Sequence, residues 1–118
     1  MTIKYTRELV ILKANQIFPN YDISEIMQIL DAYGKEKYEY EKERVQLAIL
    51  KICKDDKGDL ELLKKLVEWA KIDYRDPLWN AEYSKQSSIE YTSWVKMREK
   101  EQREIEKEDL KQYLKWLK

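Results

Sequence analysis

Two apolar helical patterns in the middle of the chain are the feature that most constrains its fold. Apolar residues recur with the spacing of one helical face across positions 45–53, and again across positions 60–74. The polar residues 55–59 separate them. Within this turn, Gly58 can take the left-handed conformation that ends a helix, and Asp59 can cap the helix that follows. So short a connection makes the two helices antiparallel neighbours.

The sequence therefore predicts an antiparallel helix pair, spanning 36–54 and 60–73, at the centre of the fold. The apolar stripes are wide, which is typical of helices with neighbours on more than one side. We expect Ile49 and Leu66 to be fully buried, each against the helix of the other.

Glycine and proline are scarce, and their positions divide the rest of the chain into helical segments. The four residues of these two types are Pro19, Gly34, Gly58 and Pro77. Before Gly34, the pattern predicts a helix from Thr6 to Phe18 and another from about Ile23 to Tyr33, capped by Thr6 and Asp22. We predict one all-α domain over residues 1–118, a compact bundle of five or six helices.

The last quarter of the chain contains neither glycine nor proline, and it begins with a capping-box spacing at Ser87 and Glu90. It predicts one continuous helix over 88–118, roughly 46 Å long at about 1.5 Å per residue. A compact domain of this length is only about 35 Å across. Residues 98–109 are mostly charged and cannot pack deeply. We therefore expect 98–118 to protrude as an interaction helix.

The end of this helix carries an isolated apolar cluster, which, if exposed to water, would favour association with another molecule. The predicted interaction residues are Leu110, Tyr113, Leu114, Trp116 and Leu117. Two arrangements hide them: the chain bends within 98–109 and folds its end back, or a straight helix lies against a second copy. The helix-forming composition of 98–109 favours the straight helix, which predicts a symmetric dimer.

Charged residues also gather around Pro77, where the second helix of the central pair ends. These residues are Asp73, Arg75, Asp76 and Glu82. They predict a polar latch in which the Arg75 guanidinium bridges Asp73 or Glu82 bidentately. The favoured interpretation is a corner that sets the angle between two helices, and the alternative is a small-ligand or partner site.

The sequence of this corner also resembles a known segment. Asp73-Tyr74-Arg75-Asp76, followed by Leu78 and by Ala81-Glu82-Tyr83, is similar to a recurrent segment of small uncharacterised all-helical bacterial proteins. The resemblance implies a bacterial helical protein and carries no activity with it.

The residues needed for common catalytic and metal sites are missing. There is no histidine, which removes the usual general base and the commonest zinc ligand. The single cysteine, Cys53, lies in an apolar stripe and is predicted to be a buried thiol. We predict no catalytic, cofactor-binding or metal-binding residue. No apolar run reaches the roughly 20 residues of a membrane-spanning helix, and no signal peptide begins the chain, so we expect a cytoplasmic protein without a membrane partner.

These observations favour a non-catalytic protein–protein interaction module that self-associates through its C-terminal helix, or binds another protein with it. The alternative is a nucleic-acid-associated regulator built on a helix-turn-helix-like arrangement, with Lys111, Lys115 and Lys118 near phosphate. The 23 basic and 23 acidic residues are mixed along the chain, which disfavours that alternative. A cluster of positive charge on one folded face would favour it. An enzyme that uses carboxylates alone remains a third possibility.

Overall fold

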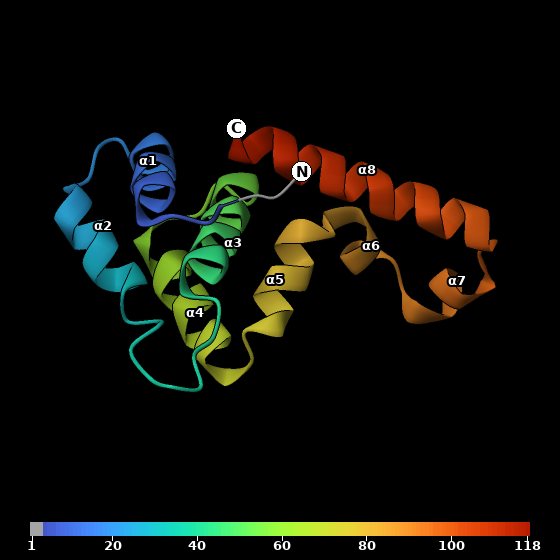
Figure 1. Cartoon of the computed structure of the whole chain (residues 1–118), viewed down its shortest axis with the longest axis horizontal. Coiled ribbons are helices and arrows are strands. Elements are labelled where there is room, and N and C mark those ends of the chain that lie inside the picture. Colours follow the sequence, from blue (N-terminus) through green and yellow to red (C-terminus); the bar gives the residue numbers. More distant parts are fainter. Residues whose placement is uncertain (1–3) are drawn as a thin grey trace.

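The computed structural model describes residues 4–118, and within this range it contains helices and no strand. The all-α class is as predicted. The helices are α1 (Arg7–Ile17), α2 (Ile23–Leu30), α3 (Lys42–Asp55), α4 (Leu60–Ile72), α5 (Arg75–Glu82), α6 (Ser84–Ser88), α7 (Tyr91–Lys96) and α8 (Glu99–Leu117). The molecule measures 46 × 28 × 27 Å along its principal axes. Helices α1 to α5 form its body, α6 and α7 lead away from that body, and α8 returns across it (Figure 1).

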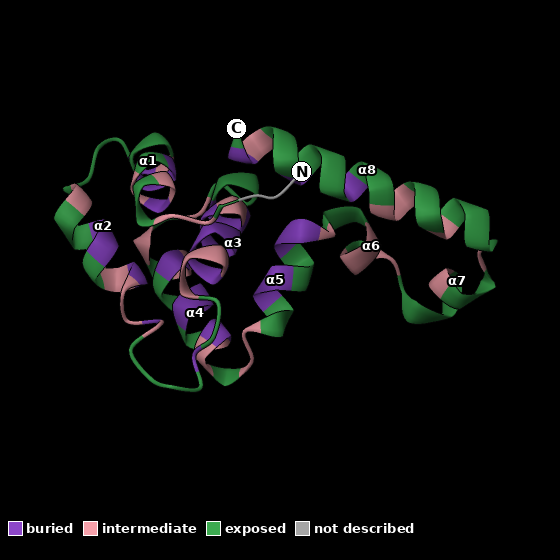
Figure 2. Ribbon diagram, in the orientation of Figure 1, coloured by how far each residue is buried: buried purple, intermediate pink, exposed green. Residues whose placement is uncertain are grey.

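Helix α3 lies at the centre of the core. It packs against α1, α4 and α5, and most of its residues are buried, including Ile49. Leu66 on α4 is buried as well. Figure 2 shows that buried residues concentrate in α3, α4 and α5. The central helix pair predicted from the apolar stripes is therefore present. Its hydrophobic surface stabilises the fold by roughly 25 cal/mol for each Å² removed from water.

Three helices begin where their capping residues predict. The Thr6 hydroxyl accepts a hydrogen bond from the Leu9 amide at 3.1 Å. The Asp22 carboxylate accepts one from the Ser24 amide at 2.9 Å, and the Asp59 carboxylate one from Leu62 at 3.1 Å. Each cap satisfies an amide that the first turn of a helix leaves without a partner.

The turn between α3 and α4 corrects the role predicted for Gly58. Lys57, not Gly58, takes the left-handed conformation, with φ 52°. The Gly58 amide donates to the Cys53 carbonyl at 2.9 Å, and the Lys57 amide to Lys54 at 3.3 Å, which is a Schellman motif. A Cβ at Gly58 would lie 2.2 Å from Cδ2 of Leu62. A side chain at position 58 would therefore have to displace the Leu62 side chain of α4.

The first helix of the central pair begins at Lys42, so the predicted start at 36 was wrong. The carboxylate of Glu39 organises a loop instead: its Oε1 accepts hydrogen bonds from the amides of Gly34, Lys35 and Glu36 at 2.9, 3.0 and 3.2 Å. Burial acts to raise the pKa of Glu39, but these hydrogen bonds outweigh it and hold that pKa below its usual value. The loop amides are thus satisfied without a helical turn.

The predicted continuous helix over 88–118 was also wrong, because the segment divides at 89–90 and at 97–98. Ser88 lies at the end of α6, where its hydroxyl donates back to the Lys85 carbonyl at 2.7 Å. Such bonds compete with helix continuation. At the second break, the Gln102 side chain donates to the Trp94 carbonyl at 2.6 Å and so satisfies the end of α7. Neither break needs glycine or proline.

Candidate functional site

Helix α8 is attached to the body by one face of its C-terminal half. Asp109, Tyr113 and Leu117 recur at the spacing of a single helical face, and all three are buried. The Tyr113 ring packs against Trp116, with ring centroids 5.6 Å apart. Burial, together with the Glu82 carboxylate, raises the pKa of the Tyr113 phenol well above its ordinary value.

The Asp109 carboxylate attaches the middle of α8 to the start of α6. Its two oxygens accept hydrogen bonds from the amides of Lys85 and Gln86, both at 3.0 Å. The residue at the local N-cap position, Tyr83, supplies no side-chain cap. Asp109 therefore caps a helix that lies 23 residues earlier in the chain. An acidic side chain at this position also interacts favourably with the helix dipole.

The C-terminal end of α8 is attached to α1 by Lys13. The Lys13 ammonium donates to the Trp116 carbonyl at 2.5 Å and lies 5.1 Å from the centroid of the Trp116 indole. Lys13 is buried, which lowers its pKa. A cation at the C-terminus of a helix satisfies free carbonyls and complements the dipole. Folding back of the helix end thus depends on specific polar contacts.

This attachment divides the five predicted interaction residues into two groups. Tyr113 and Leu117 are buried against the protein's own core, and Trp116 is partly buried. Leu110 and Leu114 remain 37% and 36% exposed. The charged stretch is one straight helix, as its composition favoured, but the chain turns before it, at 97–98, and the helix end therefore packs on its own body. The predicted dimer stays a prediction.

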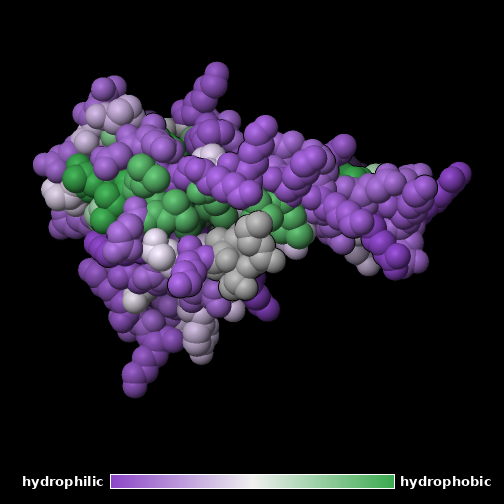
Figure 3. Space-filling model, turned by 45° about the horizontal axis from the view of Figure 1, so that its top comes forward, coloured by the Kyte–Doolittle hydropathy of each residue, from purple (hydrophilic) through white to green (hydrophobic). Residues whose placement is uncertain are grey.

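The outer face of the C-terminal half of α8 combines these two leucines with four exposed lysines. The lysines are Lys107, Lys111, Lys115 and Lys118. Among residues 4–118, no carboxylate lies within 4.0 Å of their ammonium groups. Figure 3 shows a band of hydrophobic residues across the body of the molecule, while its protruding end is mainly hydrophilic. We define Leu110, Leu114 and the four lysines as the outer α8 surface.

The structure assembles only part of the predicted latch around Pro77, the pair of Arg75 with Asp73. Arg75 pairs bidentately with Asp73, at 3.0 and 2.9 Å, and its side chain is 75% exposed. Asp76 is exposed in the first turn of α5. Glu82 lies two helical turns further along α5 and binds Arg44 instead, at 2.8 and 2.7 Å. The part of the prediction that joined Glu82 to Arg75 was wrong, because Glu82 faces α3.

Sequence reasoning missed Arg44, because no local pattern indicates its partner on α5. The Arg44–Glu82 pair links the central helix to α5, and the Glu82 hydrogen bond raises the pKa of Arg44 above its usual value. Glu39 and Asp109, the other buried carboxylates among residues 4–118, bind backbone amides. The carboxylates of Glu39, Glu82 and Asp109 are therefore each held by a structural contact.

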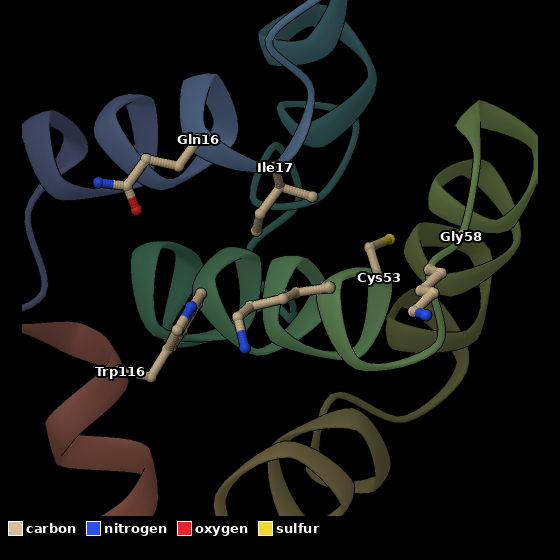
Figure 4. Close-up of a pocket in the computed structure, with 7 residues that line it drawn as sticks. Gln16, Ile17, Cys53, Gly58 and Trp116 are labelled. Atoms are coloured by element: carbon tan, nitrogen blue, oxygen red, sulfur yellow. The ribbon is translucent and has the colours of Figure 1, made fainter.

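A groove of about 470 Å³ lies where α1, α3 and α8 meet (Figure 4). Gln16 and Ile17 line it from α1, Cys53 from α3 and Trp116 from α8. The Cys53 side chain is buried, and burial, aided by the nearby Asp56 carboxylate, raises the pKa of its thiol to about 12. At neutral pH almost none of the reactive thiolate is present. The structure therefore supports a packing role for this cysteine.

A thiol-reactive chromogenic reagent should label Cys53 roughly a hundredfold more slowly in native buffer than in denaturant. The expected cause is that both access and thiolate formation require local opening of α3. Because the chain has a single cysteine, one absorbance trace reports this site alone. Equal labelling rates in the two conditions would contradict the buried placement.

Comparison with protein-family models, curated proteins and solved structures finds no match to this chain. The class that the fold defines is thus an all-α protein, and the resemblance of residues 73–83 to a bacterial segment stays a prediction. Among residues 4–118, no helix combines the length and apolar character needed to span a membrane. In the same range, no group of three or more His, Cys, Asp or Glu side chains is placed to hold a metal ion.

Proposed function

We propose that this protein is a non-catalytic protein–protein interaction module that self-associates through the outer α8 surface. The observation that carries the proposal is the exposure of Leu110 and Leu114 beside the face of α8 that is attached to the core. The contacts of Asp109 and Lys13 hold the helix backbone in place. A surface that is held in place loses less conformational entropy when a partner binds.

The two leucines supply the apolar part of the proposed contact. They lie one helical turn apart, so both reach the same partner helix. The four lysines of this surface lie around them, which gives the polar rim that is typical of protein interfaces. A second copy that covers this surface removes four partly exposed leucines from water, two from each protomer.

Replacement of both leucines, L110Q/L114Q, should weaken self-association by at least about tenfold. Tenfold corresponds to about 1.4 kcal/mol, which is less than the burial of two leucines on each protomer contributes. Sedimentation velocity over a wide range of protein concentration measures the monomer–dimer equilibrium. The matched control is Ile72→Gln, because Ile72 is an exposed aliphatic residue on α4.

Two results would reject this proposal. The first is a wild-type protein that stays monomeric at every concentration. The second is a dimer that L110Q/L114Q and Ile72→Gln affect equally, which would move the contact away from α8.

The lysines support a second candidate, a nucleic-acid-associated regulator. Lys107, Lys111, Lys115 and Lys118 gather on one folded face, and phosphate backbones attract such clusters. We favour the interaction module because phosphate binding does not require Leu110 and Leu114. Fluorescence anisotropy with labelled duplex DNA separates the two candidates. Salt-dependent binding that L110Q/L114Q leaves unchanged would favour the regulator.

A further inference from the structure

A single exposed stripe of α8 carries acidic residues in its first half and basic residues in its second. Its members repeat at alternating spacings of three and four residues, which keeps them on one side of a helix. They are Glu101, Glu104, Glu108, Lys111, Lys115 and Lys118, and all six are exposed. At 3.6 residues per turn, this stripe lies on the side of α8 opposite Tyr113, which packs on the core. We call it the charged stripe.

The separation of the two signs contributes little to the stability of α8 itself. Of the neighbours along the stripe, only Glu108 and Lys111 combine opposite charges at a favourable spacing. The other neighbours carry like charges three or four residues apart, which destabilises a helix. The helix dipole favours acids at the start and bases at the end, but its effect is limited to the first and last turns. It therefore does not account for Glu108 and Lys111 in the middle of α8.

Because of this order of charges, the stripe is complementary in charge to a second copy of itself that runs in the opposite direction. Consider an antiparallel pair of α8 helices whose two-fold axis crosses between positions 109 and 110. Glu108 then faces the partner's Lys111, because their numbers are equally distant from that axis. By the same rule, Glu104 faces the partner's Lys115. The outermost pair is Glu101 with the partner's Lys118. Every residue of the stripe meets the opposite charge.

A parallel pair gives the reverse result. It places acids against acids and lysines against lysines, and such like-charge contacts disfavour association. We infer that the charged stripe docks antiparallel against the same stripe of a second copy, across a two-fold axis between positions 109 and 110. The inference rests on the proposed self-association and adds its geometry and the residues that set its orientation.

The placement of α8 on the body permits this arrangement. The stripe points away from the core, so the two bodies lie on opposite sides of the helix pair (Figure 1). Leu114 flanks the stripe and adds apolar contact beside the charges. Exposed ion pairs contribute little affinity each. Their expected role is to select the antiparallel orientation and to make association depend on salt.

Charge exchange between two variants tests the inference. K111E/K115E leaves only one lysine in the stripe, and E104K/E108K leaves only one glutamate. Each variant alone should form dimers at least about tenfold more weakly than the wild type, because like charges face each other. An equimolar mixture should restore association, because each acid of one variant then faces a lysine of the other. Sedimentation velocity at low salt measures all three samples.

The matched control for K111E/K115E is K64E/K65E, which makes the same change in net charge on the exposed surface of α4. It should dimerise as the wild type does, and circular dichroism should show native helix content for every variant. Restoration by mixing cannot come from a variant that merely fails to fold.

Each of the other outcomes would reject a specific part of the inference or of the proposed function. If the wild type dimerises but both charge variants dimerise equally well, the antiparallel stripe is rejected and self-association stands. If the variants are monomeric alone and in mixture, the pairing across the two-fold axis is rejected. A wild type that is monomeric throughout rejects the proposed function itself.

Discussion

Replacement of Ile49 by alanine is expected to lower the free energy of unfolding by about 2–5 kcal/mol. Ile49 is fully buried on α3, the helix that packs against α1, α4 and α5. Truncation removes the transfer energy of three carbon atoms and leaves a cavity that neighbours on three sides cannot fill together. Urea denaturation followed by circular dichroism measures the change as a shift of the unfolding midpoint at unchanged slope.

Ile72→Ala provides the matched control for this result. Ile72 is also a helical isoleucine, but it is 84% exposed at the end of α4. Its truncation should change stability by no more than about 0.5 kcal/mol. Equal effects of the two substitutions would show that α3 is not the centre of the core.

Removal of the Arg44 side chain is expected to lower the free energy of unfolding by about 3 kcal/mol. Arg44→Ala leaves the Glu82 carboxylate, whose side chain is 6% exposed, without the guanidinium that now binds both of its oxygens. A buried charge that loses its partner typically destabilises a protein by about 3–5 kcal/mol. The lower end applies because the Arg44 side chain itself is partly exposed. Urea denaturation near neutral pH is the measurement.

A comparison with Arg75→Ala separates a buried pair from an exposed one. Arg75 binds Asp73 with similar bidentate geometry at the surface, where an ion pair contributes about 0–1 kcal/mol. The double variant R44A/E82Q should be more stable than Arg44→Ala alone, because it no longer contains an unpaired buried carboxylate. Equal costs for Arg44→Ala and Arg75→Ala would contradict a buried bridge between α3 and α5.

Much of the fold could be predicted because its signals are local in sequence. The caps at Thr6, Asp22 and Asp59 each involve an amide two or three residues further on. The apolar stripes of α3 and α4 are visible in consecutive turns, and they correctly indicated the buried positions of Ile49 and Leu66. Such signals need no knowledge of the tertiary structure.

The features that the sequence did not reveal depend on side chains that bind distant backbone. Glu39 replaces a predicted helical turn by binding three loop amides. Asp109 caps α6 from 23 residues away, and Gln102 closes α7 from the next helix. The choice of Arg44 as the partner of Glu82 likewise follows from the contact between α3 and α5. These contacts exist only once the helices have packed.

The candidate site could be predicted only in part, because its apolar residues are visible in the sequence but their orientation depends on how the helices pack. Composition indicated an apolar end on the C-terminal helix, but the periodicity alone did not say which residues would face the core. The break at 97–98 turns Tyr113 and Leu117 inward and leaves Leu110 and Leu114 outside. The charged stripe became visible only when its residues were known to lie opposite the buried face.

The bond between Lys13 and the Trp116 carbonyl joins positions 103 residues apart, and this separation has a consequence for the order of folding. Loop-closure entropy grows with the length of chain enclosed, so the Asp109 cap on α6, which encloses only 23 residues, costs less to form first. We therefore expect α8 to dock from its middle toward its end, with the Lys13 contact completing the outer surface last. Any partner that binds this surface also stabilises the closed chain, since it binds the folded state alone.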